Sequence, residues 1–171
     1  MNQLKVRNYL EAATNLAILL VAALVIGAYA ASYIAKRYYR QPDGLHKGKT
    51  IQPILGQDYA NASRTLLIAL NPQCGYCNES IPFYREIIRA RGTSSQSIRI
   101  IAVSQIPPPD MKQYLQEKHL DVDAVAEVNF PDLNIQATPT MILVDNNGNV
   151  LDFWIGKLST DDEQQVLKTT G

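Results

Sequence analysis

Both cysteines of this 171-residue chain lie in one Cys-x-x-Cys motif, Cys74 to Cys77, and the segments that flank it restrict the possible folds. Residues 65–70, before the motif, form a continuous apolar run of strand length, typical of a strand covered on both faces. Residues 81–88, after it, carry apolar side chains at helical spacing. The motif therefore lies at a predicted strand-to-helix turn. The free N–H groups of a helix N-terminus there favour a nucleophilic thiolate at Cys74.

The composition is that of a folded chain without excess charge. Hydrophobic residues make up 46% and charged residues 19%, and the formal net charge is zero. A balanced charge gives no indication of a nucleic-acid partner, and we expect none. Two cysteines cannot build a disulfide framework, and no second pair completes a structural zinc site. The length suits one ordinary domain with an appendage.

An uncharged apolar run near the N-terminus predicts a membrane segment. No charged residue occurs from position 12 to position 35. At about 1.5 Å per residue, a helix over this run would be roughly 36 Å long, enough to cross a hydrocarbon core of about 30 Å. We therefore predict a short tail over 1–11 and a transmembrane anchor in the lipid bilayer over 12–35. The alternative is a cleaved signal peptide, because Ala28-Tyr29-Ala30 fits a small-x-small cleavage site.

The charges beside this segment leave its orientation nearly balanced. Two basic residues precede the predicted anchor and three follow it closely, so the positive-inside rule favours a cytoplasmic domain by one residue. Long domains translocate largely regardless of charge, and the thiol chemistry favours the outside. We expect a single-pass protein of the cell membrane with its domain on the extracytoplasmic, periplasmic side. We predict a basic linker over residues 36–48 and the domain over residues 49–171.

The remaining segments predict an α/β domain. We expect further strands over 50–55 and 97–103, a helix over 107–118, and an irregular stretch over 121–136. Pro82 should kink the helix after the motif. An Asn-Gly pair between the apolar runs 141–144 and 150–155 is a strong hairpin signal, and Ser159 with Asp162 predicts a capping box on a last helix. Together these predict a mixed central β-sheet with helices on both faces.

A Cys-x-x-Cys beside a βαβ pattern predicts redox chemistry. Cys74, exposed at the turn, would attack a disulfide, and Cys77, one helical turn inward, would resolve the product. A c-type haem site would require histidine at position 78, where Asn78 stands. A purely structural disulfide is disfavoured, because so small a loop removes little entropy from the unfolded chain. We expect no bound metal and no cofactor besides the redox-active Cys74–Cys77 disulfide.

Three sequence features together resemble the thioredoxin superfamily. They are Cys74-Gly75-Tyr76-Cys77, Pro82 five residues after the second cysteine, and Ala137-Thr138-Pro139-Thr140 before a strand. With the N-terminal membrane segment, the chain is most similar to membrane-anchored, extracytoplasmic thioredoxin-like proteins of the TlpA/ResA type. The resemblance covers 49–171 and implies a thioredoxin-like three-layer fold, preceded here by one transmembrane helix.

The resemblance also implies roles for individual residues. Cys74 would be the nucleophile, Cys77 the resolving thiol and Pro139 a cis-proline facing them, while Thr138 and Tyr76 would contact the substrate chain. It implies protein thiols and disulfides as substrates, and a membrane or thioredoxin-like protein as electron donor. Two positions depart from the pattern. Gln73 replaces the usual tryptophan, and Ile68 replaces the buried aspartate of thioredoxins.

These observations favour a membrane-anchored thiol–disulfide oxidoreductase that acts as a reductase of protein disulfides. Two alternatives stay open. The first is a Cu(I)-binding, metallochaperone-like module that uses the same two cysteines, although further soft ligands are not close in sequence. The second is a thioredoxin-fold interaction domain without catalytic activity.

Overall fold

The computed structural model describes residues 13–29, 44–54, 58–91 and 98–170. The chain divides into two compact units, Met1–Asp43 and Gly44–Gly171. In the first unit, residues 13–29 form a helix with exposed side chains. Among the described residues, no helix combines the length and the apolar character that a membrane span requires. The predicted tail lies outside the described residues, as do both ends of the predicted anchor and most of the predicted linker.

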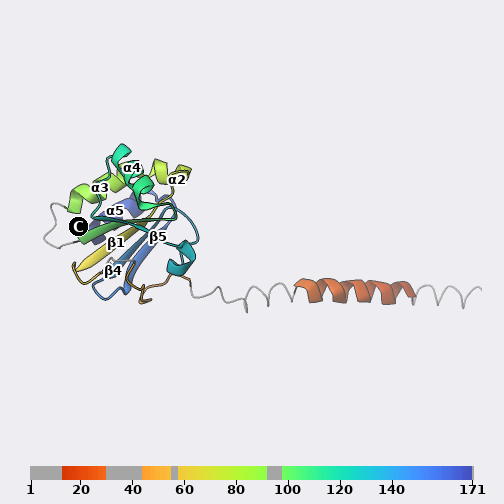
Figure 1. Ribbon diagram of the computed structural model, residues 1–171. Coiled ribbons are helices and arrows are strands. Elements are labelled where there is room, and N and C mark those ends of the chain that lie inside the picture. Colours follow the sequence, from red (N-terminus) through yellow and green to blue (C-terminus); the bar gives the residue numbers. More distant parts are fainter. Residues whose placement is uncertain (1–12, 30–43, 55–57, 92–97, 171) are drawn as a thin grey trace, which may run out of the picture. The chain divides into compact units, whose positions relative to one another are not determined.

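The second unit is built on a five-stranded sheet with the strand order β3-β2-β1-β4-β5 (Figure 1). Strand β1 pairs in parallel with β2, which pairs in parallel with β3. On its other side β1 pairs antiparallel with β4, which forms a hairpin with β5. The sheet is mixed, as predicted from the sequence. The strands are β1 Arg64–Ala69, β2 Ile98–Ser104, β3 Ala124–Glu127, β4 Thr140–Asp145 and β5 Val150–Ile155.

The longer helices of this unit all pack on one face of the sheet. In β1, Leu66 and Ile68 join the apolar cluster beneath these helices, while Leu67 and Ala69 join a second cluster on the opposite face. The short 3₁₀-helix η1 and the chain around Ile51 cover that opposite face. The helices are α2 Gly75–Glu79, α3 Ile81–Arg91, α4 Pro108–Glu117 and α5 Thr160–Thr170, and η1 spans Phe130–Leu133.

In the described part of the chain, the prediction of helices on both faces is therefore confirmed by η1 alone, the short helix on the face opposite to the longer helices. The physical reason lies in the crossovers. The connections β1-α3-β2 and β2-α4-β3 both step outward in the same direction along the sheet. Because such crossovers are right-handed, their two helices must lie on the same face.

Two predicted segments differ from the structure. The stretch 121–136, expected to be irregular, contains strand β3 as well as η1. The stretch 50–55 does not form the expected strand in its described part, where Thr50 makes only an isolated bridge to Asn149. Pro53 supplies no N–H to a ladder, which accounts for the short pairing. The segment is nevertheless attached to the β4–β5 turn, because Ile51 N–H donates to Gly148 O and Val150 N–H donates to Lys49 O, each at 2.8 Å.

The helix after the cysteine motif is interrupted, as Pro82 led us to expect. Helix α2 ends at Glu79, Ser80 is its C-cap, and α3 begins at Ile81. Pro82 lacks the N–H that would continue the helical ladder through this point. At the other end of the unit, Asp162 N–H donates to Ser159 Oγ at 3.3 Å, so the predicted cap of α5 is confirmed.

Candidate active site

Cys74 lies where the chain turns from β1 into α2. Asn71 shapes this turn, because its side-chain oxygen accepts the Gln73 N–H and its carbonyl accepts the Cys74 N–H, each at 2.9 Å. Cys74 is the N-cap of α2, with an extended backbone (φ −79°, ψ 116°). Its Sγ accepts the Cys77 N–H at 3.3 Å. The turn therefore places the first sulfur against free N–H groups of the helix and close to the second cysteine.

The segment before β4 brings a second chain element to this sulfur. The Thr138–Pro139 peptide bond is cis, in agreement with the expectation for Pro139. The Cys74 thiol donates to Thr138 O at 3.2 Å. Two hydrogen bonds hold the segment, from Gly156 N–H to Pro139 O at 2.7 Å and from Thr140 Oγ1 to Ala137 O at 2.7 Å. The pairing of β1 with β4 places this segment beside the cysteine turn, because Ala69, the last residue of β1, lies opposite Thr140, the first residue of β4.

Hydrogen bonding sets the acidity of Cys74. Partial burial raises the pKa of its thiol, but hydrogen bonds from the Thr138 side chain, from Cys77 and from the backbone N–H of Tyr76 outweigh burial, so the pKa is lowered. All these partners are neutral. The thiolate is therefore favoured by local dipoles.

Cys77 has the opposite character. It is fully buried, with 0% of its surface exposed. Burial raises the pKa of its thiol to about 11, and the hydrogen bond with Cys74 adds to the increase. Both cysteines carry free thiols in this structure. The pair thus combines an accessible acidic thiol with a buried thiol that holds its proton.

The structure also locates the other residues considered from sequence. Tyr76 is 62% exposed between the two cysteines. Ile68 is buried in the same apolar cluster as Cys77, so this position offers no proton acceptor. Glu79 forms an ion pair with Lys157 at 2.6 Å, with about half of each side chain exposed to solvent. Glu79 therefore belongs to a solvated helix face.

Sequence reasoning missed two residues that structure this turn. Asn78 donates through Nδ2 to Pro72 O at 2.9 Å and to Cys74 O at 3.1 Å. Tyr114, on α4, donates its hydroxyl to Asn78 Oδ1 at 3.1 Å. An amide directly after the motif was a usable signal for Asn78. Nothing in the sequence pointed to Tyr114, because its contact depends on how α4 packs.

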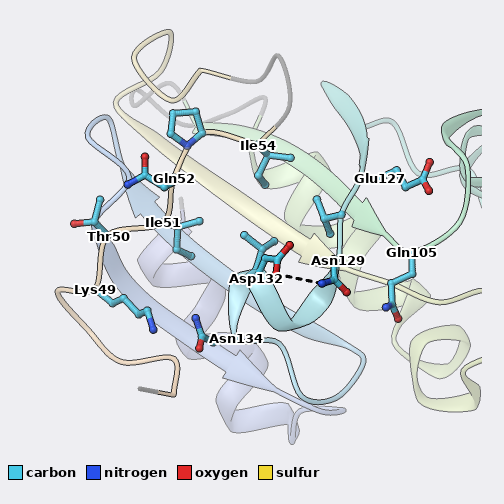
Figure 2. Close-up of a pocket in the computed structure, with 13 residues that line it drawn as sticks. Lys49, Thr50, Ile51, Gln52, Ile54, Gln105, Glu127, Asn129, Asp132 and Asn134 are labelled. Carbon is cyan, nitrogen blue, oxygen red and sulfur yellow. Dashed lines mark hydrogen bonds between the residues drawn. The ribbon is translucent and has the colours of Figure 1, made fainter. Parts of the chain in front are cut away.

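A cavity of about 770 Å³ has neither cysteine in its lining (Figure 2). It is lined by the segment from Lys49 to Ile54, by Gln105, and by residues 127–129 and 132–134. None of the predicted site residues lines it. In the part of the chain that the structure describes, no group of three or more His, Cys, Asp or Glu side chains converges as a metal site.

The sheet order, the Cys-x-x-Cys at a helix N-terminus and the adjacent cis-proline define an α/β domain of the thioredoxin fold. Comparison with solved structures agrees. A thioredoxin domain of a thiol-disulfide oxidoreductase from Bacteroides vulgatus matches with a TM-score of 0.56 and 18% identity, over 75% of this chain and 100% of that chain. A putative thiol:disulfide interchange protein DsbE from Chlorobium tepidum matches with a TM-score of 0.55 and 22% identity, over 75% and 100%. StoA from Bacillus subtilis matches with a TM-score of 0.52 and 16% identity, over 64% and 84%.

At these identities the likeness establishes the fold. No protein-family model and no curated protein sequence matches the chain.

Proposed function

We propose that this protein is a membrane-anchored thiol–disulfide oxidoreductase that reduces disulfide bonds in protein substrates. The observation that carries the proposal is the asymmetry of the pair. Cys74 is partly exposed with a lowered pKa, while Cys77 is buried with its pKa raised to about 11. Reduction of a disulfide by a cysteine pair uses these two properties: one thiolate attacks, and a second thiol later resolves the mixed disulfide. The redox group is the cysteine pair itself.

The first step is attack by Cys74. Its thiolate bonds to one sulfur of the substrate disulfide, the substrate S–S bond breaks, and the released substrate sulfur takes up a proton. Tyr76, exposed beside the thiol, supplies apolar contact area to the substrate chain. The backbone of Thr138 and the ring of Pro139 provide the adjacent surface along which that chain binds.

The second step is resolution by Cys77. Its thiol loses a proton and attacks Cys74 Sγ, which forms the Cys74–Cys77 disulfide and releases the second substrate thiol. The substrate has gained two electrons and two protons, and the pair has lost them. A dithiol donor, either a membrane protein or a thioredoxin-like protein, then reduces the pair by the reverse exchange.

The source of thiolate stabilisation supports the reductase direction. A pair becomes a strong oxidant when its reduced form is strongly stabilised. Neutral hydrogen-bond donors lower the pKa of Cys74 here. Hydrogen bonding from neutral groups is weaker than pairing with a charge, and the groups that lower the pKa of Cys74 are neutral, so the reduced form lacks this stronger source of stabilisation.

The membrane part of the proposal rests on the N-terminal sequence. The uncharged run over 12–35 has the length of a span, and apolar side chains of the helix over 13–29 such as Leu24 are exposed. We place the domain on the extracytoplasmic side, where protein disulfides are abundant.

Reduction of insulin disulfides by the purified full-length chain tests the activity. The wild type with a dithiol donor should accelerate insulin precipitation, and Cys74→Ser should abolish this acceleration because the attacking sulfur is lost. Cys77→Ser should accumulate a mixed disulfide with the substrate, detectable by non-reducing electrophoresis. Unchanged turnover by Cys74→Ser would refute the assignment. Stoichiometric Cu(I) binding without any disulfide turnover would instead favour the metallochaperone alternative.

A further inference from the structure

Asn78, the first residue after the cysteine pair, lies in α2, and its side-chain amide binds the backbone of the turn that precedes this helix. Its Nδ2 donates to the carbonyls of Pro72 and Cys74, at 2.9 and 3.1 Å, and its backbone N–H also donates to Cys74 O, at 3.2 Å. Asn78 therefore forms hydrogen bonds with Cys74, which has the attacking sulfur, and with Pro72, two positions earlier in the turn. Together with the hydrogen bonds of Asn71, these contacts fix the path of the backbone through Cys74.

Tyr114 fixes the orientation of this amide. Its hydroxyl donates to Asn78 Oδ1 at 3.1 Å, and its side chain is only 7% exposed. With the amide oxygen bound to a hydroxyl donor, the amide nitrogen must face the two carbonyls, so each polar atom of the amide has a matching partner. Tyr114 belongs to α4, which lies outside the cysteine turn in sequence. A residue of the β2-α4-β3 unit thus holds a residue of the active-site helix.

The amide also affects the electrostatics at the sulfur. A carbonyl oxygen near a thiolate repels it, and a donor bound to that oxygen offsets part of its negative charge. The Asn78 amide donates to the carbonyl of Cys74, in the same residue as the sulfur. This hydrogen bond therefore favours the charged form of Cys74.

We propose that Asn78, held by Tyr114, is a positioning residue for thiol exchange: it sets the geometry of Cys74 and makes α4 part of the active-site support. Its role in exchange rests on the function proposed above. Its effect on the Cys74 thiol does not, and can be measured without any disulfide substrate.

The experiment compares Asn78→Ala and Asn78→Asp with the wild type in the full-length chain. The readout is the rate of Cys74 alkylation by iodoacetamide as a function of pH. Both variants should shift the midpoint of this profile upward, and at neutral pH the rate should fall by about threefold to tenfold, since one pKa unit is a factor of ten. The fall should be larger for Asn78→Asp, because it removes the donor and adds a negative charge. Unchanged profiles in both variants would overturn the proposal.

Asn129→Ala is the matched control. This amide also donates to a neighbour, Asp132 Oδ1 at 3.1 Å, but it lines the cavity of Figure 2, and neither cysteine is in that lining. Its alkylation profile should equal that of the wild type. A shift as large as that of Asn78→Ala would show that any lost surface amide disturbs Cys74, and would overturn the proposal.

Tyr114→Phe removes only the hydroxyl and keeps the buried ring, so it tests the proposal even if the Asn78 variants fail to fold. It should raise the midpoint by less than Asn78→Ala. Added to Asn78→Ala it should change nothing further, because Tyr114 acts through the amide. An independent, additive shift would overturn the link between these two residues. If the wild type fails to reduce insulin but these shifts occur, the proposed function fails and the positioning role stands.

Discussion

At the scale of single residues, burial and hydrogen bonding give two identical side chains different properties. One cysteine is suited to act as the nucleophile and the other as the resolving thiol. Cys74 caps α2 and receives N–H groups, while Cys77, three positions later, points into the apolar cluster beneath the helices. The N-cap position offers several donors to the first sulfur, and burial removes the second from water. The roles therefore follow from where each sulfur stands on one helical turn.

This division predicts two well-separated thiol titrations. In Cys77→Ser, ultraviolet absorbance of the thiolate should appear below the ordinary pKa of a cysteine, because the lowered pKa of Cys74 means that the proton leaves at lower pH. Alkylation of this variant should accelerate as pH rises through that value and then level off, since only the thiolate reacts.

The complementary variant, Cys74→Ser, should show thiolate absorbance only above the ordinary pKa of a cysteine, because burial, the largest cause of the raised pKa of Cys77, is unchanged in this variant. Denaturing each variant should return both titrations to the ordinary range. Equal midpoints for the two folded variants would contradict the assignment of attacking and resolving roles.

The cysteine roles were predicted from the residues of the motif and Pro139 from the family resemblance, but the residues that support the site were not predicted. The Cys-x-x-Cys spacing of Cys74 and Cys77 indicates redox chemistry by itself. Pro139 belongs to a recognisable local pattern, Ala-Thr-Pro-Thr before a strand. The contact between Asn78 and Tyr114 joins residues 36 positions apart. Such a contact is set by the packing of α4, and no local spacing encodes it.

At the scale of elements, local signals predicted the segments whose structure is decided locally. The Asn-Gly turn predicted the β4–β5 hairpin, and Pro82 predicted the interruption between α2 and α3. Strand β3 was missed because only Ala126 of its four residues is buried, so it carries no alternating pattern. Its pairing with β2 comes from the crossover through α4, which is a tertiary effect.

The β4–β5 turn depends on a glycine for two separate reasons. Gly148 has φ +82°, and a Cβ added there would clash with the backbone carbonyl of Ile51 and lie 3.1 Å from the Tyr59 ring. Gly148→Ala should therefore lower the free energy of unfolding by about 2–5 kcal/mol, from left-handed strain and from the clash with backbone. Denaturant unfolding measures this loss.

Gly48→Ala is the matched control for this prediction. Gly48 has nearly the same φ, +83°, but an added Cβ meets nothing within 4 Å. It should cost only the left-handed strain, about 1–2 kcal/mol. Equal losses in the two variants would show that the Ile51 carbonyl moves aside at no cost, and would contradict the clash as a second reason for glycine at position 148.

At the scale of the whole molecule, the two compact units predict a domain that folds alone. Gly44–Gly171 contains both apolar clusters, the complete sheet and the cysteine site. Expressed by itself, this part should unfold cooperatively and keep the alkylation profile of the full chain. A non-cooperative transition or an ordinary cysteine profile would show that the N-terminal unit is required for the fold.

The same division allows a test of the proposed anchor. In cell fractionation, the full chain should sediment with membranes and resist extraction by alkaline carbonate, whereas Gly44–Gly171 should stay in the soluble fraction. A version of the full chain with charged residues placed within positions 16–21 is the control, since charges in the apolar run disfavour insertion. Release of the full chain by carbonate would contradict the anchor.

The attachment of Lys49 and Ile51 to the β4–β5 turn has a mechanical consequence. Arg64 and Asp145 mark this end of the sheet, while Ala69 and Thr140 mark the end that carries the cysteine turn. At about 3.3 Å per residue, the five steps along β4 separate the two ends by roughly 17 Å. Tension applied to the chain upstream of Gly44 would load β5 first, through the ion pair of Lys47 with Asp152 and the hydrogen bond from Gly48 N–H to Val150 O, and then the hairpin turn. Such a pull would therefore reach the hairpin before it reaches the cysteine turn, which lies at the other end of the sheet.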